Sequence, residues 1–284
     1  MCRFTFYRGA PIALSSLITD PINSLIHQSF HSHEREEPLN GDGFGVAWYA
    51  DGHVEPALFR SITPAWSNRN LRELAAVVRS PCILAHVRAA TQQTDVAETN
   101  CHPFKRGAVA FMHNGDIGGF RAMRRALIAG LSDRAYQGIA GSTDSEHFFA
   151  VLLDELGRND QSSAASGLDL ALEGALGRIL EPRTRHAPEE HCYINAVVTD
   201  GHRAVACRFT TDDPANADSL YVNHGRRYVC EGDVCRMVDP EGSDASVLIS
   251  SESLSTDPGW VPVPVNSLVT IGPGLHPSPR PISV

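Results

Sequence analysis

The chain has 284 residues, of which 42% are hydrophobic and 20% charged, and its formal net charge at pH 7 is −9. This composition supplies enough apolar material for one large globular domain or two small ones, and it excludes a disordered or fibrous chain. The acidic balance disfavours a nucleic-acid partner, because a phosphate-binding surface needs net or clustered positive charge. The dense basic stretch FRAMRRALIAG places its three arginines at helical spacing, which is typical of a solvated helix face.

The cysteines show no short, regular spacing that would indicate a disulfide framework. They stand at Cys2, Cys82, Cys101, Cys192, Cys207, Cys230 and Cys235. Their odd number in a chain of this length predicts reduced thiols and a cytoplasmic location. The N-terminal region lacks a charged stretch followed by a sustained apolar run, so we expect no signal peptide, and no run is long enough to span a bilayer. The spacing of the cysteines and of the 13 histidines matches no familiar four-ligand pattern, so we expect no metal and no cofactor.

Strands and helices can be predicted from the apolar pattern in chain order. Short runs rich in Val, Ile, Phe and Tyr predict strands that begin near Phe4, Gly43, Cys82, Ala108, Tyr193, Arg203, Leu220, Ser246 and Leu268. Helices are predicted for NLRELAAVVRS, ended by Pro81, for GFRAMRRALIAG, closed by Gly130, for DSEHFFAVLLDELG, closed by Gly157, and for SGLDLALEGALGRIL. Asp200-Gly201 lies between two strand runs and predicts a hairpin turn. Strands grouped at both ends with helices between them favour an α+β sandwich of two mainly antiparallel sheets covered by helices.

The most polar stretch, near residues 157–190, is a candidate domain boundary. We favour a long excursion with one helix inside a single domain that spans residues 1–284. The strands that follow it lack the start signals and the self-contained helices of an independent fold.

Cys2 directly follows the initiator methionine, at the start of a predicted strand. Methionine removal is favoured when the next residue is small, so the mature chain can begin with Cys2. That residue would carry a thiol nucleophile together with an α-amine whose reference pKa of about 7.7–8.0 suits a general base. This is the logic of an N-terminal nucleophile. The alternative is a small buried hydrophobe near a chain terminus.

Asn114 and Gly115 follow an apolar strand in the stretch FMHNGDIGGF. The simplest interpretation is a tight turn, since both residues tolerate positive φ. The functional alternative is an oxyanion hole, in which the Asn114 amide and the Gly115 N–H point at the oxygen of a tetrahedral intermediate.

Arg88 ends an otherwise apolar strand in LAHVRAATQQT, where a guanidinium is costly unless it is paired. Its partner is either an internal carboxylate or a substrate carboxylate held by the guanidinium fork.

Asp144 stands in GSTDSEHFF, where Thr143-x-x-Glu146 has the form of a helix capping box. The capping box explains the stretch without any function. The alternative is an Asp144 that faces a pocket and pairs with a substrate ammonium group. Together, a nucleophile with its base, an oxyanion hole, an anion clamp and a cation clamp describe a site for an α-amino acid attacked at its side-chain carbonyl.

The stretches MCRF, NGDGFGVAWY, AHVRAAT, ETNCHPF, FMHNG and STDSE occur in an order that resembles the class II glutamine amidotransferases of the N-terminal-nucleophile hydrolase superfamily. They look most like the subgroup with the amidotransferase subunit of the fungal Dug glutathione-degradation complex and its bacterial relatives. The resemblance is strong through about residue 153, and ISSESL and NSLVTIGPG echo it later. It implies a four-layer αββα sandwich.

The resemblance also implies roles for individual residues. Cys2 would be the nucleophile, and Asn114 and Gly115 would form the oxyanion hole. Arg88 would bind the substrate α-carboxylate, Asp144 the α-ammonium, and Thr91 would line the same pocket. The better-known members place Trp after the arginine, whereas this chain has Ala89, so closure of the pocket over the substrate is expected to differ.

Five further residues in the same motifs are assigned supporting roles: Asn40, Asp42, Gly43, His102 and His113. NGDGFG lacks the Lys-Ser/Thr of a phosphate loop and is followed by a strand-like run. We therefore expect it to pack its backbone closely beside Cys2, with Asn40 and Asp42 as hydrogen-bond partners of the new N-terminus.

The predicted reaction is hydrolysis of a γ-glutamyl amide through a γ-glutamyl thioester on Cys2, with glutamine, glutathione or a related γ-glutamyl compound as substrate. The chain shows no acceptor-binding synthase module, so we expect a separate acceptor or metallopeptidase-type subunit, or simple hydrolysis. The alternative is a non-catalytic γ-glutamyl-binding or scaffold subunit that keeps Met1.

Overall fold

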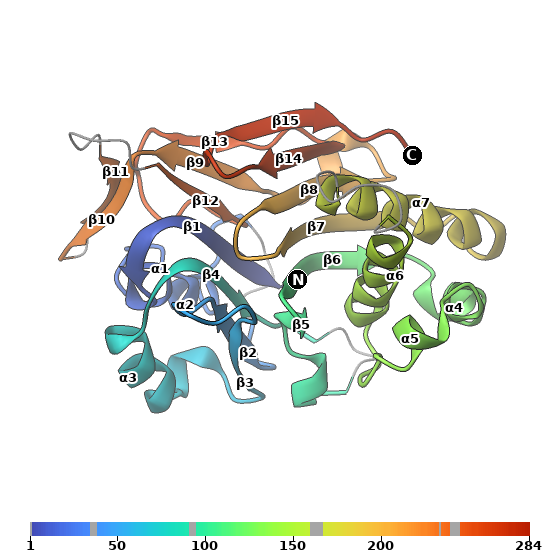
Figure 1. Cartoon of the computed structure of the whole chain (residues 1–284), viewed down its shortest axis with the longest axis horizontal. Coiled ribbons are helices and arrows are strands. Elements are labelled where there is room, and N and C mark those ends of the chain that lie inside the picture. Colours follow the sequence, from blue (N-terminus) through green and yellow to red (C-terminus); the bar gives the residue numbers. More distant parts are fainter. Residues whose placement is uncertain (1, 35–38, 91–94, 160–166, 233, 239–244) are drawn as a thin grey trace.

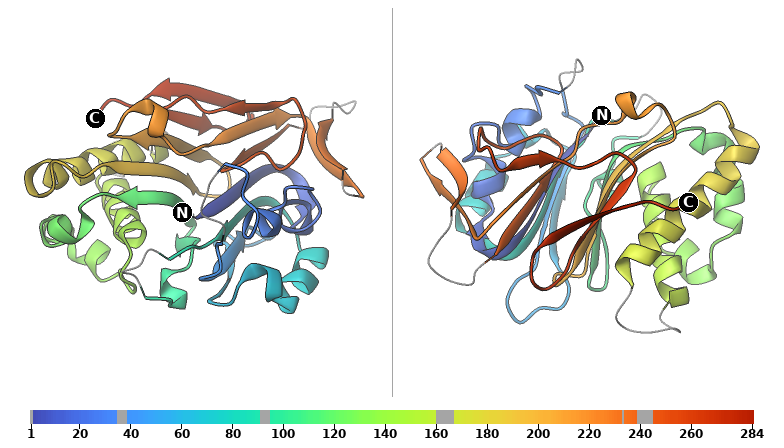
Figure 2. Two further views of the ribbon diagram at one scale, coloured as in Figure 1. Left: turned by 180° about the vertical axis from the view of Figure 1, so that it is seen from behind. Right: turned by 90° about the horizontal axis from the view of Figure 1, so that it is seen from above.

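The protein is a four-layer sandwich in which two sheets lie face to face and helices cover both outer faces. A computed structural model describes residues 2–34, 39–90, 95–159, 167–232, 234–238 and 245–284. The view from above in Figure 2 shows the two sheets edge-on, with α1–α3 on one side and α4–α7 on the other. The predicted α+β sandwich of two mainly antiparallel sheets is confirmed.

The first sheet contains the N-terminal strand. Its strands are β1 (Arg3–Ala13), β2 (Phe44–Trp48), β3 (Ala57–Ser61), β4 (Arg79–Val87), β9 (Tyr221–Gly225), β12 (Ser246–Ser250) and β13 (Trp260–Pro262). Among the described residues these seven pair antiparallel in the order β13-β9-β12-β1-β4-β2-β3. β1 therefore lies in the middle of the sheet, between two strands that come from distant parts of the chain.

The second sheet is built from the strands β5 (Phe104–Arg106), β6 (Val109–Ile117), β7 (Cys192–Thr199), β8 (Ala204–Thr210), β14 (Ser267–Ile271) and β15 (Pro277–Pro281). Their order is β15-β14-β8-β7-β6-β5, with antiparallel pairing throughout. The predicted hairpin between β7 and β8 is confirmed. Gly201 has a φ of 85°, and the Asp200 N–H donates to the Arg203 carbonyl at 3.2 Å.

The helices divide between the two outer faces. α1 (Ser15–Ile18), α2 (Leu25–Gln28) and α3 (Arg69–Val77) cover the first sheet, and α4 (Phe120–Ala129), α5 (Asp133–Tyr136), α6 (Asp144–Asn159) and α7 (Leu168–His186) cover the second. Short 3₁₀ helices lie at η1 (Ala65–Ser67), η2 (Glu98–Asn100) and η3 (Pro214–Asn216). α4 ends at Gly130, as its sequence predicts. α6 continues past Gly157 to Asn159, so the predicted end of that helix is wrong by two residues.

Pro81 does not end a helix, contrary to the prediction from its sequence position. α3 ends at Val77, and Pro81 lies within β4. The pairing of β1 with β4 shifts between Arg8, opposite Cys82, and Ile12, opposite Ser80. Pro81 falls at this irregularity, where a missing N–H costs no ladder hydrogen bond.

Side-chain alternation along the strands decides which residues reach the space between the sheets. Phe4 and Phe6 of β1 pack in the inter-sheet core together with Met112 of β6, whereas Tyr7 packs under α1–α3. Because successive strand residues point to opposite faces, Cys2 has the same parity as Phe4 and Asn114 has that of Met112. Both residues therefore belong to the end of the inter-sheet layer.

The single-domain organisation stays a prediction, and the packing of α7 supports it. Leu172 and Leu176 of α7 are fully buried in the same core as Phe148 of α6 and Ile194 of β7. The helix inside the polar stretch is thus part of the helical layer over the second sheet.

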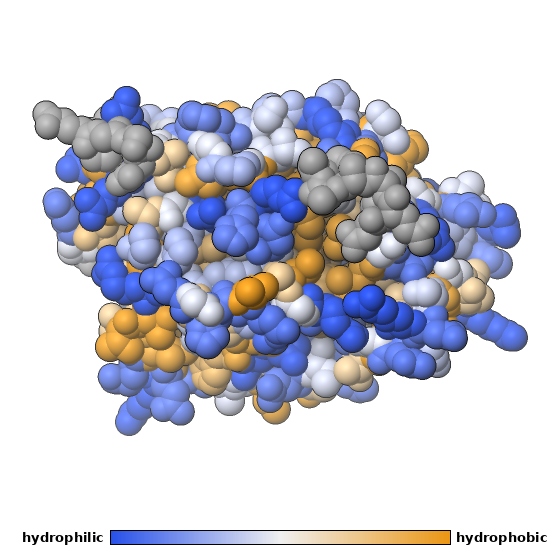
Figure 3. Space-filling model, viewed as in Figure 1, coloured by the Kyte–Doolittle hydropathy of each residue, from blue (hydrophilic) through white to orange (hydrophobic). Residues whose placement is uncertain are grey.

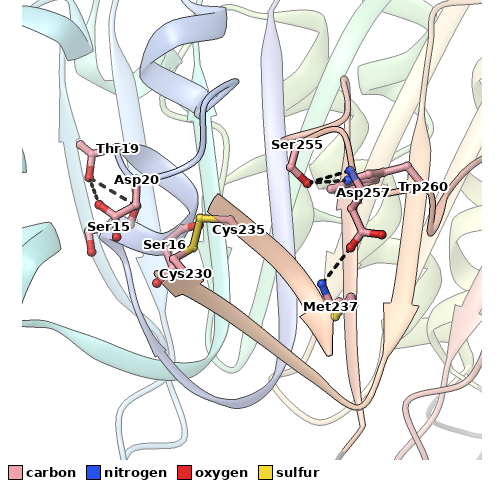
Figure 4. The surroundings of a disulfide bond; sticks show 10 residues. All are labelled: Ser15, Ser16, Thr19, Asp20, Cys230, Cys235, Met237, Ser255, Asp257 and Trp260. Carbon is pink, nitrogen blue, oxygen red and sulfur yellow. Dashed lines mark hydrogen bonds between the residues drawn. A yellow bond between two sulfur atoms is a disulfide. The ribbon is translucent and has the colours of Figure 1, made fainter. Parts of the chain in front are cut away.

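Cys230 and Cys235 form a disulfide, so the prediction of reduced thiols is wrong for this pair (Figure 4). They face each other in a hairpin of β10 (Arg227–Glu231) and β11 (Val234–Val238). Directly opposed residues of an antiparallel pair have adjacent Cβ atoms, so the two thiols can bond. The sequence spacing alone did not reveal that these two cysteines oppose each other. The cytoplasmic location stays a prediction.

The face that carries the start of β1 is largely hydrophilic, with apolar side chains showing in small groups (Figures 1 and 3). Across the part of the chain that the structure describes, no helix combines the length and the apolar character needed to cross a membrane.

Candidate active site

Cys2 lies just before β1, half-buried, with its thiol against the segment that follows β4. Its Sγ lies 3.6 Å from the carbonyl oxygen of Ala89. The pairing of Arg3 with Val87 places residue 2 level with Arg88 on the neighbouring strand. The β1–β4 register thus brings Cys2 to the Arg88 motif.

The loop before β2 holds the segment that the thiol contacts. The Asp42 N–H donates to the Arg88 carbonyl at 3.0 Å, and the Arg88 N–H donates to the Gly43 carbonyl at 2.8 Å. The Asp42 carboxylate accepts from the Ala90 N–H at 2.8 Å. Asp42 therefore orders the peptide that the Cys2 thiol contacts, and its hydrogen bond to the new N-terminus stays a prediction.

Gly43 packs closely against neighbouring segments of the chain, and its packing beside Cys2 stays a prediction. With a φ of 119°, a Cβ there would lie 2.6 Å from Cys101 Sγ and 2.8 Å from the Ser61 carbonyl oxygen. Asn40 is buried, its N–H donates to Ser29, and its side-chain oxygen has no hydrogen-bond partner in the described residues.

Asn114 and Gly115 lie inside β6 rather than in a turn, so the turn interpretation is wrong. β6 continues to Ile117 and pairs with β7 through both residues. Gly115 has a φ of 150°, and a Cβ there would lie 1.8 Å from the Tyr193 carbonyl oxygen, which excludes any other residue without movement of β7. The Asn114 side chain is buried at the inter-sheet layer, where its Nδ2 donates to Ser251 Oγ at 3.4 Å.

Arg88 and Asp144 lie close enough to Cys2 for their charges to act on its thiol. Burial raises the pKa of the Cys2 thiol, while a backbone hydrogen bond at Ala89 and the Arg88 charge lower it, and the Asp144 charge raises it. Arg88 is buried and donates to the Asp95 carbonyl at 3.3 Å. The structure thus brings together a thiol, a guanidinium and a carboxylate from three separate motifs.

Asp144 begins α6 and ties it to β6. Its Oδ2 accepts from the Ile117 N–H at 3.0 Å, and its Oδ1 from the Ser145 N–H at 2.7 Å. Only one of the two hydrogen bonds of the capping box is formed: the Glu146 N–H donates to Thr143 Oγ1 at 3.2 Å. The Glu146 carboxylate instead accepts from the N–H groups of Ala140 and Gly141. Thr91 lies outside the described residues.

His102 and His113 belong to a buried group with His86. The His86 and His102 rings stack at 4.2 Å, His86 Nε2 lies 3.1 Å from the His113 carbonyl oxygen, and His113 Nδ1 lies 2.9 Å from Ser145 Oγ. Burial lowers the pKa of all three histidines, that of His86 to about 3. The rings are therefore neutral at pH 7, and their supporting role stays a prediction.

Four residues around Cys2 were missed from the sequence: Arg3, Ser32, Ser251 and Glu252. Arg3 Nη1 donates to the Cys2 carbonyl at 2.9 Å, and Arg3 Nε donates to Glu252 at 2.7 Å. Ser251 Oγ accepts from the Phe4 N–H at 3.1 Å as well as from Asn114. The signal was available in ISSESL, which carries Ser251 and Glu252, but nothing in the sequence places it beside residue 2.

Among the described residues, no group of three or more His, Cys, Asp or Glu side chains has the arrangement to hold a metal ion.

Comparison with known proteins agrees with this geometry. Residues 14–276 match the family model of class-II glutamine amidotransferases. The chain is 38% identical to the probable glutamine amidotransferase DUG3 of Saccharomyces cerevisiae, over 95% of this chain and 82% of the yeast protein. It is 27% identical to the gamma-glutamyl-hercynylcysteine sulfoxide hydrolase of Mycolicibacterium smegmatis, over 95% of this chain and 96% of that enzyme.

Solved structures show the same fold. A glutamine aminotransferase class-II domain protein from Silicibacter pomeroyi superposes with a TM-score of 0.68 at 28% identity, over the full length of both chains. The glutamine phosphoribosylpyrophosphate amidotransferase of B. subtilis superposes with a TM-score of 0.57 at 13% identity, over all of this chain and 50% of that one, and shows the fold alone. The extent of the family match and the identity to the yeast protein establish that this chain is a member of the class-II glutamine amidotransferases.

Proposed function

We propose that this protein hydrolyses γ-glutamyl amides, with Cys2 as the N-terminal nucleophile after removal of Met1. The observation that carries the proposal is the convergence on one thiol: Cys2 Sγ lies against Ala89, and the charges of Arg88 and Asp144 both act on it. The names of the yeast and mycobacterial relatives, an amidotransferase and a γ-glutamyl hydrolase, support the same reaction class.

In the proposed reaction the Cys2 sulfur attacks the γ-glutamyl carbonyl, and the α-amine of Cys2 takes the thiol proton. The Asn114 amide and the Gly115 N–H stabilise the oxyanion, which collapses to a γ-glutamyl thioester as the amine returns the proton to the leaving group. Water then hydrolyses the thioester and releases glutamate. Asn114 Nδ2 has two N–H groups, and only one of them donates to Ser251.

Recognition of the glutamyl group is assigned to the two charged side chains. We assign Arg88 to the α-carboxylate, because a guanidinium fork suits a carboxylate, and Asp144 to the α-ammonium. Thr91 stays a proposed contact in the same pocket. Two buried acceptors have no hydrogen-bond partner in the described residues: Asn40 Oδ1 and Asn114 Oδ1. Either oxygen is a candidate to accept a hydrogen bond from the α-amine of the mature N-terminus.

Two candidate substrates and reactions remain within this class. The resemblance of the sequence motifs to the Dug subgroup favours glutathione or a related γ-glutamyl thiol, and it also motivates a separate acceptor or metallopeptidase-type subunit. The mycobacterial relatives favour plain hydrolysis.

The test uses untagged protein incubated with glutamine, glutathione and other γ-glutamyl amides, with released glutamate as the readout. We expect release from at least one substrate and none from Cys2→Ala. Absence of release from every substrate, with and without a candidate partner, would leave only the γ-glutamyl-binding role.

A further inference from the structure

Cys2 lies outside the strand pairing that begins at Arg3. β1 begins at Arg3, whose pairing with Val87 is the first of the β1–β4 ladder, so residue 2 extends beyond the sheet. Once Met1 is removed, Cys2 is attached to the protein through one peptide bond only. The orientation of its backbone then depends on contacts other than the pairing of β1 with β4.

We propose that Arg3 and Glu252 form a positioning pair that fixes the Cys2 carbonyl and thereby aims the nucleophile. This inference rests on the proposed function. Arg3 Nη1 donates to the Cys2 carbonyl oxygen at 2.9 Å, and Arg3 Nε donates to Glu252 Oε1 at 2.7 Å. The guanidinium thus connects the Cys2 carbonyl to a carboxylate that lies 249 positions after Arg3.

A closed network holds the pair in one geometry. Arg3 Nη2 donates to Ser32 Oγ at 2.7 Å, and Ser32 Oγ in turn hydrogen-bonds Glu252 Oε1. The other carboxylate oxygen accepts from the His33 N–H at 3.0 Å. All three guanidinium nitrogens and both carboxylate oxygens are engaged, so the planar fork cannot rotate without breaking several bonds.

Burial argues that the pair serves more than stability. The side chains of Arg3 and Glu252 are each 2% exposed. Desolvation of two charges offsets much of their attraction, and apolar residues of similar volume often stabilise a fold equally well. A fork that reaches the Cys2 carbonyl, in contrast, cannot be replaced by an apolar side chain.

This difference supplies the experiment. Arg3→Met combined with Glu252→Leu removes both charges and leaves neither one buried alone, so we expect an unfolding midpoint close to that of the wild type. We expect kcat to fall at least about tenfold with KM within about twofold, because the glutamyl contacts are retained while the thiol is misplaced. Arg3→Lys keeps the charge but not the guanidinium fork, so its kcat should lie between that of the wild type and that of the double variant.

The matched control is Arg280→Met with Glu173→Leu. Arg280 Nη1 and Nη2 each donate to the Glu173 carboxylate at 2.9 Å, in an ion pair between α7 and β15. This double variant should leave kcat unchanged. Intact mass must show that Met1 is removed from every protein compared.

A second readout separates this inference from the proposed function, because it needs no substrate. Iodoacetamide alkylation of Cys2, followed by peptide mass spectrometry, should be several-fold faster in the Arg3→Met, Glu252→Leu protein, since the thiol leaves its half-buried place against Ala89. If wild-type protein releases no glutamate, the proposed function fails while this result still stands. Equal alkylation rates, or a double variant with wild-type kcat, would overturn the positioning role.

Discussion

Asn114 Nδ2 donates to Ser251 Oγ across the space between the two sheets, at 3.4 Å. Asn114 belongs to β6 of the second sheet, and Ser251 directly follows β12 of the first. Because Ser251 Oγ also accepts from the Phe4 N–H, one hydroxyl links the proposed oxyanion donor to the strand that carries Cys2. The relative position of Cys2 and Asn114 therefore depends on how the sheets pack.

Removing the oxyanion donor should affect turnover far more than binding. We expect Asn114→Ala to lower kcat by about 10²–10³. Ser251→Ala keeps the Asn114 amide and loses only its fixed orientation, so its kcat should fall by a smaller factor, about tenfold. Steady-state kinetics on the best γ-glutamyl substrate measures both, and an Asn114→Ala protein with near-normal kcat would refute the assignment.

Gly115→Ala should destabilise the second sheet. Its Cβ would lie 1.8 Å from the Tyr193 carbonyl oxygen, so β6 and β7 must separate locally. Gly107→Ala is the control, because Gly107 also has a positive φ, 55°, but nothing lies within 4 Å of its Cβ position. We expect a loss of about 1 kcal/mol in the free energy of unfolding for Gly107→Ala and a clearly larger loss for Gly115→Ala, measured by denaturant unfolding. Equal losses of unfolding free energy in the two variants would show that the contact with Tyr193 does not destabilise the Gly115→Ala protein.

The buried histidines should make the fold sensitive to acid. Burial lowers the folded-state pKa of His86, His102 and His113, so the unfolded chain binds protons more readily as pH falls. The stability is fully present above the unfolded pKa of about 6.5 and is lost below it, by up to about 1.4 kcal/mol per pH unit for each histidine. Unfolding curves measured between pH 7 and pH 4 record the slope.

His102→Phe tests the source of that slope, because it keeps the ring stack and removes one titrating group. We expect a shallower acid limb than in the wild type. His53→Gln, at an exposed histidine, is the control and should leave the slope unchanged. A His102→Phe protein with the wild-type slope would assign the acid sensitivity to other groups.

Variants of Arg88 and Asp144, the two side chains proposed to bind the glutamyl group and here called the glutamyl clamp, should change KM. Arg88→Lys keeps a positive charge but loses the two-nitrogen fork, and Asp144→Asn loses the charge that would pair with an ammonium group. We expect KM to rise about tenfold or more in each, with a smaller change in kcat. Asp133→Asn is the matched control for Asp144, because Asp133 is also the first residue of a helix. A change of KM in the control alone, or in none of the three, would contradict the clamp.

Much of the architecture was predictable because its signals are local. The alternation around Phe4, the Asp200-Gly201 turn and the glycine that ends α4 each depend on neighbours in the chain. The prediction that Pro81 ends a helix was wrong, because Pro81 lies in a strand at an irregularity in the pairing of β1 with β4. Only the folded sheet creates that irregularity. The Cys230–Cys235 disulfide was missed for the same reason, since its hairpin register is not visible in the spacing.

The site was predictable in its parts and not in its assembly. Cys2, Arg88 and Asp144 stand in motifs that can be identified one by one. Other hydrogen bonds around the site join residues far apart in the chain, such as Arg3 with Glu252 and Asn114 with Ser251. Both partners lie in the stretch ISSESL, which can be identified in the sequence, but only the packing of the sheets places it beside residue 2.

The central claim is that Cys2 acts as the first residue of the mature chain. The most direct test is a protein made with an N-terminal extension that a specific protease removes to leave Cys2 first, with glutamate release measured before and after cleavage and the N-terminus checked by intact mass. We predict no release before cleavage and full release after it. Equal release from the extended and the cleaved protein would contradict the claim, because a blocked α-amine cannot serve as the base.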